Sequence, residues 1–182
     1  MNKRKIHLGC GSKEIPGWFH VDILDYPHVD HRGPVEDLSF IEDSTVELIY
    51  ASHVLEHFGR WAYMDALREW RRVLVSGGIL RLAVPDFGAV ARLYVSGTLP
   101  RGIEDLRGLI CGGQRDQYDF HGMIFDEADL TRALLECGFK EVRRWDWRST
   151  EHCSLDDYSQ AYIPHMDKDN GALVSLNLEA MA

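Results

Sequence analysis

Short apolar segments separated by turn residues recur along the first half of the chain. They are Lys5–Leu8, Trp18–Asp22, Val46–Ala51 and Ile79–Val84. Short apolar runs bounded by Gly, Pro and Asp are typical of buried strands, so each is predicted to be one. Only six residues lie between Gly11 and Trp18. Because parallel strands usually need a dozen or more connecting residues, we expect the first crossover helix to be shortened or absent.

The second half adds helical patterns between the strands. Trp61–Leu74 repeats its apolar residues with helical spacing and is predicted to stop at Gly77-Gly78, and a second helix runs from the capping residue Asp126 to Gly138. Two further strands are predicted, Lys140–Trp147 and Ala172–Leu178. Strands alternating with helices indicate an α/β fold with a mainly parallel sheet.

Residues 85–125 have no regular period and contain many glycines. We expect an irregular lid or acceptor pocket there, at about 86–125, inserted into a single domain that spans 1–182. The lid carries aromatic rings that could stack on a substrate and arginines that could donate to it. These are Tyr94, Tyr118 and Phe120, and Arg92, Arg101, Arg107 and Arg115.

Composition narrows the class of protein. A chain of 182 residues with 45% hydrophobic and 27% charged residues is typical of one globular domain. Its formal net charge of -9 opposes binding to a nucleic acid, which requires a basic surface. The four cysteines form no Cys-x-x-Cys pair, which disfavours a disulfide framework. No apolar run is long enough to span a bilayer, and we expect a cytoplasmic protein.

The turn after the first predicted strand, Gly9-Cys10-Gly11, lets backbone approach a ligand closely. A dinucleotide-binding turn would carry a third glycine where Glu14 stands, so the cradle for a pyrophosphate is missing. Asp22 ends the second predicted strand, where its carboxylate can accept from both ribose hydroxyls. Asp37 can accept from an adenine amino group while a neighbouring N–H donates to the ring. This pattern fits a nucleoside without phosphates.

Several motifs in order resemble class I S-adenosylmethionine-dependent methyltransferases of the type 11 group. The motifs are Leu8-Gly-Cys-Gly, Val21-Asp22, Glu36-Asp37-Leu38, Ala51-Ser-His-Val-Leu-Glu-His57 and Arg72-Val-Leu-Val-Ser-Gly-Gly78. The final segment Ser175–Ala180 is similar to the terminal strand of a small bacterial subgroup often associated with cell-surface polysaccharide genes. The resemblance implies a Rossmann-like seven-stranded sheet with the last strand antiparallel, and S-adenosylmethionine as cofactor.

The resemblance also implies site residues. Gly9, Cys10 and Gly11 would lie along the methionine and ribose of the cofactor and Asp22 would hold the ribose. Asp37 with Leu38 would hold the adenine, while Ser52 and His53 would border the methionine end. The expected activity is O-methylation of a small-molecule or glycan hydroxyl.

A hydroxyl acceptor benefits from a base, and histidine titrates near the required pH. His121 is the first candidate and His53 the second, each with a structural histidine as the alternative interpretation. Asp86 follows the fifth predicted strand and is expected to meet the acceptor, because ligands of open α/β sheets bind beyond the carboxyl ends of strands.

The segment His53-Val-Leu-Glu56-His57 matches the His-x-x-Glu-His pattern of inverted zinc proteases, but it follows a strand rather than lying in a helix. Some methyltransferases carry Glu-x-x-Glu-His here and bind a divalent ion. Because His53 replaces the first glutamate, we expect no metal, although an ion shared by these residues and His121 stays open.

Other hypotheses remain at this point. A non-catalytic cofactor-binding or scaffold protein would have the same fold, since fold alone does not fix activity. A nicotinamide-dependent sugar reductase or epimerase would need a Tyr-x-x-x-Lys pair, but Tyr63 is followed by Leu67. The missing first helix is expected to leave Trp18 or Phe19 uncovered, which favours a homodimer.

Overall fold

A computed structural model describes residues 4–182 and contains a seven-stranded sheet of order β3-β2-β1-β4-β5-β9-β6. The strands are β1 (Lys5–Leu8), β2 (Phe19–Asp22), β3 (His31–Arg32), β4 (Val46–Ser52), β5 (Leu74–Pro85), β6 (Lys140–Arg144) and β9 (Ser175–Met181). β9 pairs antiparallel with β5 and β6, and the other strand pairs are parallel. This confirms the predicted Rossmann-like sheet with its last strand antiparallel.

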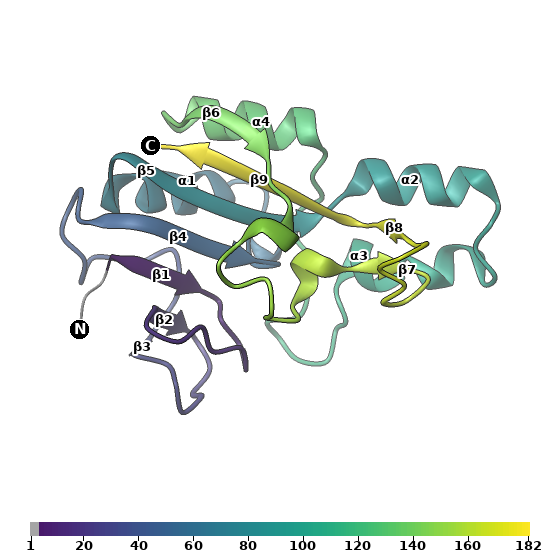
Figure 1. Ribbon diagram of the computed structural model, residues 1–182, viewed down its shortest axis with the longest axis horizontal. Coiled ribbons are helices and arrows are strands. Elements are labelled where there is room, and N and C mark those ends of the chain that lie inside the picture. Colours follow the sequence, from purple (N-terminus) through teal and green to yellow (C-terminus); the bar gives the residue numbers. More distant parts are fainter. Residues whose placement is uncertain (1–3) are drawn as a thin grey trace.

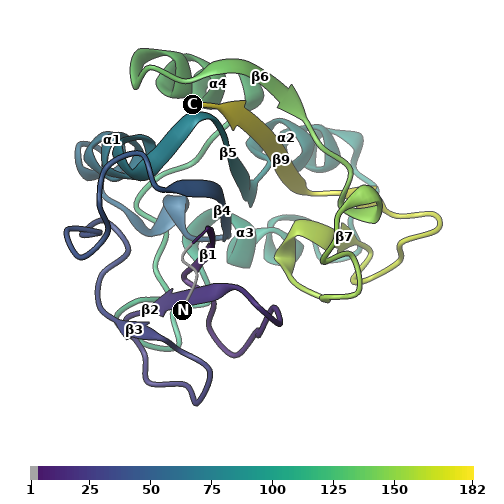
Figure 2. The same ribbon diagram turned by 60° about the vertical axis from the view of Figure 1, so that its left-hand side comes forward.

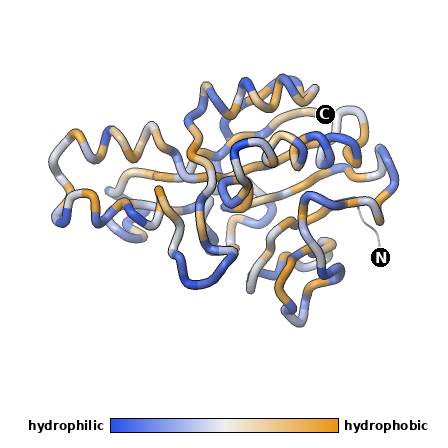
Figure 3. Tube along the Cα trace, turned by 180° about the vertical axis from the view of Figure 1, so that it is seen from behind, coloured by the Kyte–Doolittle hydropathy of each residue, from blue (hydrophilic) through white to orange (hydrophobic). Residues whose placement is uncertain are grey.

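Two helices, α1 (Ala62–Val73) and α4 (Glu127–Glu136), cover one face of the sheet, behind it in Figure 1. Their apolar side chains recur with helical spacing, and hydrophobic positions alternate with hydrophilic ones along the helices in Figure 3. The largest of them, Trp70 of α1, is fully buried and donates from Nε1 to the Val35 carbonyl at 2.8 Å. The main hydrophobic core therefore lies between these helices and the sheet.

Helix α1 ends within one residue of the predicted position, but not at the predicted stop signal. The glycine pair Gly77-Gly78 was expected to stop it, but the chain leaves the helix at Val73 and continues directly into β5. The N–H groups of Ser44 and Thr45 donate to the carbonyls of Arg72 and Val73, which satisfies the helix end without a glycine. Helix α4 begins as predicted, because the Asp126 side chain accepts from the Asp129 N–H at 2.8 Å.

The opposite face of the sheet has no helix between β1 and β2, as predicted. Irregular chain covers it instead: Ile15 and Trp18 pack with Tyr50 of β4 and with Trp145, which follows β6. Trp145 donates from Nε1 to the Leu82 carbonyl at 2.9 Å. In Figure 1 the chain that follows β6 runs in front of the sheet, on the side away from α1.

This cover removes the stated reason for a homodimer. Trp18 or Phe19 was expected to be exposed, yet each is only 8% exposed within the single chain, Trp18 beneath this cover and Phe19 in the main core. Trp18 lies edge-on to both Tyr50 and His152. The segment after β6 has thus taken the place of the missing helix. No uncovered face remains at Trp18 to favour a homodimer.

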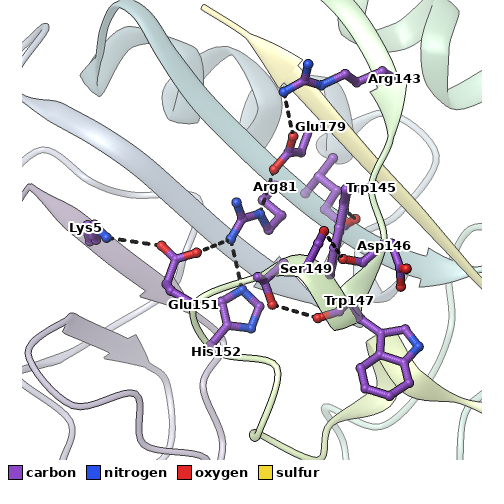
Figure 4. A network of polar contacts seen from close by, with 12 residues as sticks. Lys5, Arg81, Arg143, Trp145, Asp146, Trp147, Ser149, Glu151, His152 and Glu179 are labelled. Carbon is purple, nitrogen blue, oxygen red and sulfur yellow. Dashed lines mark hydrogen bonds and ion pairs between the residues drawn. The ribbon is translucent and has the colours of Figure 1, made fainter.

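Charged contacts hold this segment on the sheet, as Figure 4 shows. Arg81 of β5 donates to Glu179 of β9 at 2.8 Å and to Glu151 at 3.0 Å, and Lys5 of β1 reaches Glu151 at 3.1 Å. The Arg81 side chain is mostly buried, so these contacts are screened less than surface ion pairs. They join three strands to the segment that replaces a helix.

Residues 86–125 contain more regular structure than the sequence predicts. The segment was expected to be irregular, but it includes α2 (Phe87–Ser96), η2 (Gly102–Asp105) and α3 (Arg107–Cys111). It leaves and rejoins the sheet at one place, because Asp86 forms a bridge with Phe125 and the Phe87 N–H donates to the Phe125 carbonyl. The segment therefore begins and ends side by side at the carboxyl end of β5.

A small hairpin lies at the same end of the sheet. Its strands are β7 (Tyr162–Ile163) and β8 (Ala172–Leu173), so the predicted strand Ala172–Leu178 is divided between β8 and β9. Short helical turns complete the fold: η1 (Leu55–His57), η3 (Trp147–Ser149) and η4 (Tyr158–Gln160). Figures 1 and 2 show α2, α3 and the hairpin gathered beyond one end of the sheet. Within residues 4–182, no helix has the length and apolar character needed to cross a membrane.

Candidate functional site

The structure brings the turn after β1 and the end of β2 together. The Gly11 N–H donates to Asp22 Oδ2 at 2.7 Å, and the Leu24 N–H donates to Oδ1 at 2.8 Å. The Asp22 side chain is buried, but a carboxylate offers about four lone-pair sites, so it can still accept from ribose hydroxyls. These residues fit the ribose of a bound nucleoside.

Both glycines of this turn have positive φ, +59° for Gly9 and +52° for Gly11, which disfavours other residues. A Cβ on Gly9 would collide with the Val54 side chain, whereas a Cβ on Gly11 would meet no atom within 4 Å. Gly9 therefore serves close packing and Gly11 faces open space where a ligand can approach. Between them, burial raises the pKa of the Cys10 thiol to about 12, which excludes a thiolate at neutral pH.

Asp37 and Leu38, the two residues predicted to hold adenine, differ in exposure and in hydrogen bonding. Asp37 is exposed and accepts from the Ser39 N–H at 3.1 Å, and hydrogen bonds from the Ser39 side chain and then from this N–H lower the pKa of its carboxyl. The Leu38 side chain is fully buried, and its N–H donates to Glu69 Oε1 at 2.9 Å. The Asp37 carboxylate is thus open to a ligand, while the Leu38 N–H already has a partner.

A cavity of about 860 Å³ lies between the 86–125 segment and the chain around β7. Its walls include Leu93, Arg101, Leu109, Arg115, Asp119, His121, Asp157, Tyr158, Tyr162 and His165, together with His53 and His57. Of the predicted site residues, only His53 and His121 line it. The wall at residues 157–166 was missed by sequence reasoning, because this short turn and strand carry no recognisable motif.

The lid residues singled out from the sequence contribute less to this cavity than expected. Tyr94, Tyr118 and Phe120 do not line it, and each is substantially exposed. Arg101 and Arg115 do line it, but each forms an ion pair, with Asp105 and Asp119 respectively. The cavity wall therefore carries many donors and acceptors with compensated charge.

Asp86 has a different position from the two histidines. Its carboxylate accepts from the Ala89 N–H at 2.9 Å and so caps α2, and it lies 3.6 Å from Arg144. It is buried and does not line the cavity. We interpret Asp86 as a positioning residue that fixes the start of the insertion.

Three histidines surround the fully buried side chain of Glu56 on η1. His53 Nδ1 lies 3.2 Å from Glu56 Oε1, and His121 Nε2 lies 4.0 Å from the same atom. The rings of His57 and His121 are 5.0 Å apart. Burial lowers the pKa of His121, although Glu56 opposes this effect.

Gly122 allows the end of the 86–125 segment to pack against η1, which places His121 beside Glu56. The N–H of Gly122 donates to the Glu56 carbonyl at 2.8 Å, and a Cβ at position 122 would collide with the Phe58 carbonyl. Residues far apart in sequence therefore meet through backbone contact that only glycine permits. Sequence motifs gave His53, Glu56 and His57 as neighbours, but only the fold adds His121.

A family model described as a methyltransferase domain matches residues 20–82, about a third of the chain. The matched residues run from β2 to β5 and include Asp22, Asp37 and the His53–His57 segment. No curated protein matches the sequence.

Solved structures of methyltransferases share the fold across nearly the whole chain. An S-adenosylmethionine-dependent methyltransferase from Thermotoga maritima has a TM-score of 0.61 and 14% identity, covering 98% of this chain and 81% of its own. One from Archaeoglobus fulgidus has a TM-score of 0.59 and 12% identity, with 99% and 86% covered. One from Mesorhizobium loti has a TM-score of 0.56 and 14% identity, with 100% and 91% covered.

Together, the domain match and the shared fold support an S-adenosylmethionine-dependent methyltransferase of the class I type, with S-adenosylmethionine as its cofactor. The open approach to Gly11 and the carboxylates of Asp22 and Asp37 fit that cofactor. The missing phosphate cradle is consistent with it, because the adenosine carries no phosphates.

Proposed function

We propose that this protein transfers a methyl group to a hydroxyl of a polar small molecule or glycan bound in the 860 Å³ cavity. One observation carries the proposal: Val54 packs against Gly9 of the cofactor turn, and the preceding residue, His53, lines the cavity. The methionine end of the cofactor and the acceptor would therefore meet at residues 53 and 54.

The composition of the cavity wall supports a sugar-like acceptor. Tyr158 offers an aromatic surface 5.2 Å from the His53 ring, and Tyr162 adds another ring. Flat rings with polar tips suit the apolar faces and hydroxyls of a sugar. The paired arginines and aspartates supply hydrogen-bond donors and acceptors for the hydroxyls of such an acceptor.

When bound, S-adenosylmethionine supplies a methyl group on a positively charged sulfur. The acceptor oxygen would form a bond to that methyl carbon as the carbon–sulfur bond breaks and its electron pair stays on sulfur, and the hydroxyl proton would pass to a histidine of the cavity wall. We propose His121 first, and His53 second, as the groups that meet this hydroxyl and activate it. The surrounding insertion would orient the acceptor and exclude water, which supply much of the acceleration in such a displacement.

A screen of nucleotide sugars and glycans with S-adenosylmethionine tests the proposal. We expect the demethylated cofactor to form together with a methyl ether on the acceptor, identified by mass spectrometry. Turnover confined to protein or nucleic-acid acceptors would overturn the substrate class. Formation of an N-methyl or C-methyl product would overturn the assignment of a hydroxyl.

A further inference from the structure

The hydrogen bonds on the outer side of two histidines fix which ring nitrogen carries the proton. His57 Nδ1 lies 3.0 Å from the Phe120 carbonyl, and His121 Nδ1 lies 3.1 Å from the Leu109 carbonyl. A carbonyl can only accept, so Nδ1 must be the donor in both rings. In the neutral rings, Nε2 of each therefore carries a lone pair.

His53 is fixed by a longer chain of hydrogen bonds. Asn177 donates from Nδ2 to the Ser159 carbonyl, which leaves its Oδ1 to accept the Ser175 hydroxyl proton at 2.8 Å. Ser175 Oγ must then accept at its contact of 3.2 Å with His53 Nε2. His53 Nε2 thus carries a proton, and in the neutral ring the lone pair on Nδ1 faces Glu56 at 3.2 Å.

At the centre, Glu56 is 0% exposed, and beyond the contact of 3.2 Å between His53 Nδ1 and Oε1 neither carboxylate oxygen has a hydrogen-bond partner among the described residues. When the three rings are neutral, lone pairs of imidazole nitrogens converge on this buried carboxylate. Such an arrangement is unfavourable unless a positive charge lies between the groups, because a buried anion needs a partner.

We propose that Glu56, His57 and His121 bind one divalent transition-metal ion such as Zn²⁺, with His53 at the edge of the site. Their three ligand atoms lie within 4.8 Å of one another. Two ligands bonded at about 2.1 Å lie about 3.4 Å apart, so small side-chain rotations would close the site. The bonds from His57 and His121 to backbone carbonyls are the outer contacts that orient metal-binding imidazoles.

This inference differs from the expectation of no metal, which rested on His53 replacing a glutamate. The three ligands here do not include position 53, and two imidazoles with one carboxylate are a ligand set typical of zinc with one position left open. His57 and His121 line the acceptor cavity, so the open position would face the acceptor. A bound ion there would lower the pKa of an acceptor hydroxyl, and His121 would then activate that hydroxyl as a ligand of the ion rather than by taking its proton, a role that rests on the proposed function.

Metal binding by the whole protein tests the site without turnover. Equilibrium dialysis against Zn²⁺ or Co²⁺, followed by elemental analysis, should give one ion per chain, and Co²⁺ should develop a visible absorption band. His57→Ala and His121→Ala should each weaken binding at least tenfold, as should Glu56→Gln. Because imidazole is a poor ligand for Mg²⁺, we expect no stoichiometric binding of that ion.

His165→Ala is the matched control, because His165 lines the same cavity but lies outside the cluster. It should bind Co²⁺ as the wild type does. If Glu56→Gln fails to fold, as judged by circular dichroism, the two histidine variants carry the test. The proposal is overturned if the folded wild type binds no ion, as expected when a proton on His53 balances Glu56 instead, or if all three variants bind normally.

The test of the metal site and the test of the proposed methyl transfer can fail independently. An ion bound by the cluster, with no methyl ether formed from any hydroxyl acceptor, would support the site and contradict the function. Methyl transfer at full rate by a protein that binds no ion would support the function and contradict the metal site.

Discussion

The Gly11 N–H donates to Asp22 Oδ2 at 2.7 Å, so the turn after β1 and the end of β2 form one unit. Asp22→Ala should weaken binding of S-adenosylhomocysteine about ten- to a hundredfold, because a charged hydrogen-bond acceptor is lost. Asp37→Ala should weaken it less, since Asp37 is exposed. Isothermal titration calorimetry measures both effects.

Asp25→Ala is the control for that titration, because the Asp25 side chain is 80% exposed and lies just beyond β2. Its affinity should equal that of the wild type. Unchanged titrations for both Asp22→Ala and Asp37→Ala would contradict the proposed cofactor site.

His121→Ala should lower the rate of methyl transfer about a hundredfold or more and leave S-adenosylhomocysteine affinity nearly intact. The reason is that His121 lines the acceptor cavity, whereas the predicted cofactor residues on β1 and β2 do not. Steady-state kinetics combined with calorimetry separates the two effects. Transfer at the wild-type rate would remove His121 from the reaction.

Trp145→Ala should destabilise the fold by about 3–5 kcal/mol, the usual cost of truncating a buried tryptophan. Trp145 covers the sheet face that lacks a helix, and it also donates to the Leu82 carbonyl. Urea denaturation measures the change in the free energy of unfolding. Trp61→Ala, at a residue 80% exposed, should change it by less than about 0.5 kcal/mol. Equal effects for the two variants would mean that Trp145 does not replace the helix.

Acid should destabilise the fold through His7. Burial of the ring, followed by the neighbouring charges of His20 and His152, lowers the pKa of His7 from 6.5 to about 3. Between these values the unfolded chain binds a proton that the folded chain does not, so stability is complete above pH 6.5 and falls as the pH decreases. This one group contributes a slope of up to about 1.4 kcal/mol per pH unit.

Urea denaturation between pH 4 and pH 7 checks this, with His7→Phe as the comparison. Phenylalanine is similar in shape and cannot take up the proton, so its stability should fall less steeply with acid. The same slope in both proteins would show that His7 does not drive the acid response.

Local patterns were sufficient for most of the elements. The strands β1, β2 and β4 and the start of α4 follow from short apolar runs and from the capping geometry of Asp126, because these depend on nearby residues, whereas the two-residue strand β3 has no such run and was not predicted. The apolar spacing gave the end of α1 to within one residue, but the cause of that end could not be predicted, since the last carbonyls are satisfied by Ser44 and Thr45 from another part of the chain. The helix α2 was overlooked because its surroundings are rich in glycine.

The sequence by itself determined the order of the sheet motifs, the cofactor turn at Gly9-Gly11 and the position of Asp22, since each is encoded by residues a few positions apart. Only the tertiary structure decided that the segment after β6 replaces the first helix, and that His121 joins Glu56 and His57. Both results depend on contacts between residues distant in sequence: Trp145 with the sheet, and Gly122 with the Glu56 carbonyl. Periodicity and spacing report which groups a local segment presents, whereas packing and long-range hydrogen bonds determine which of them meet.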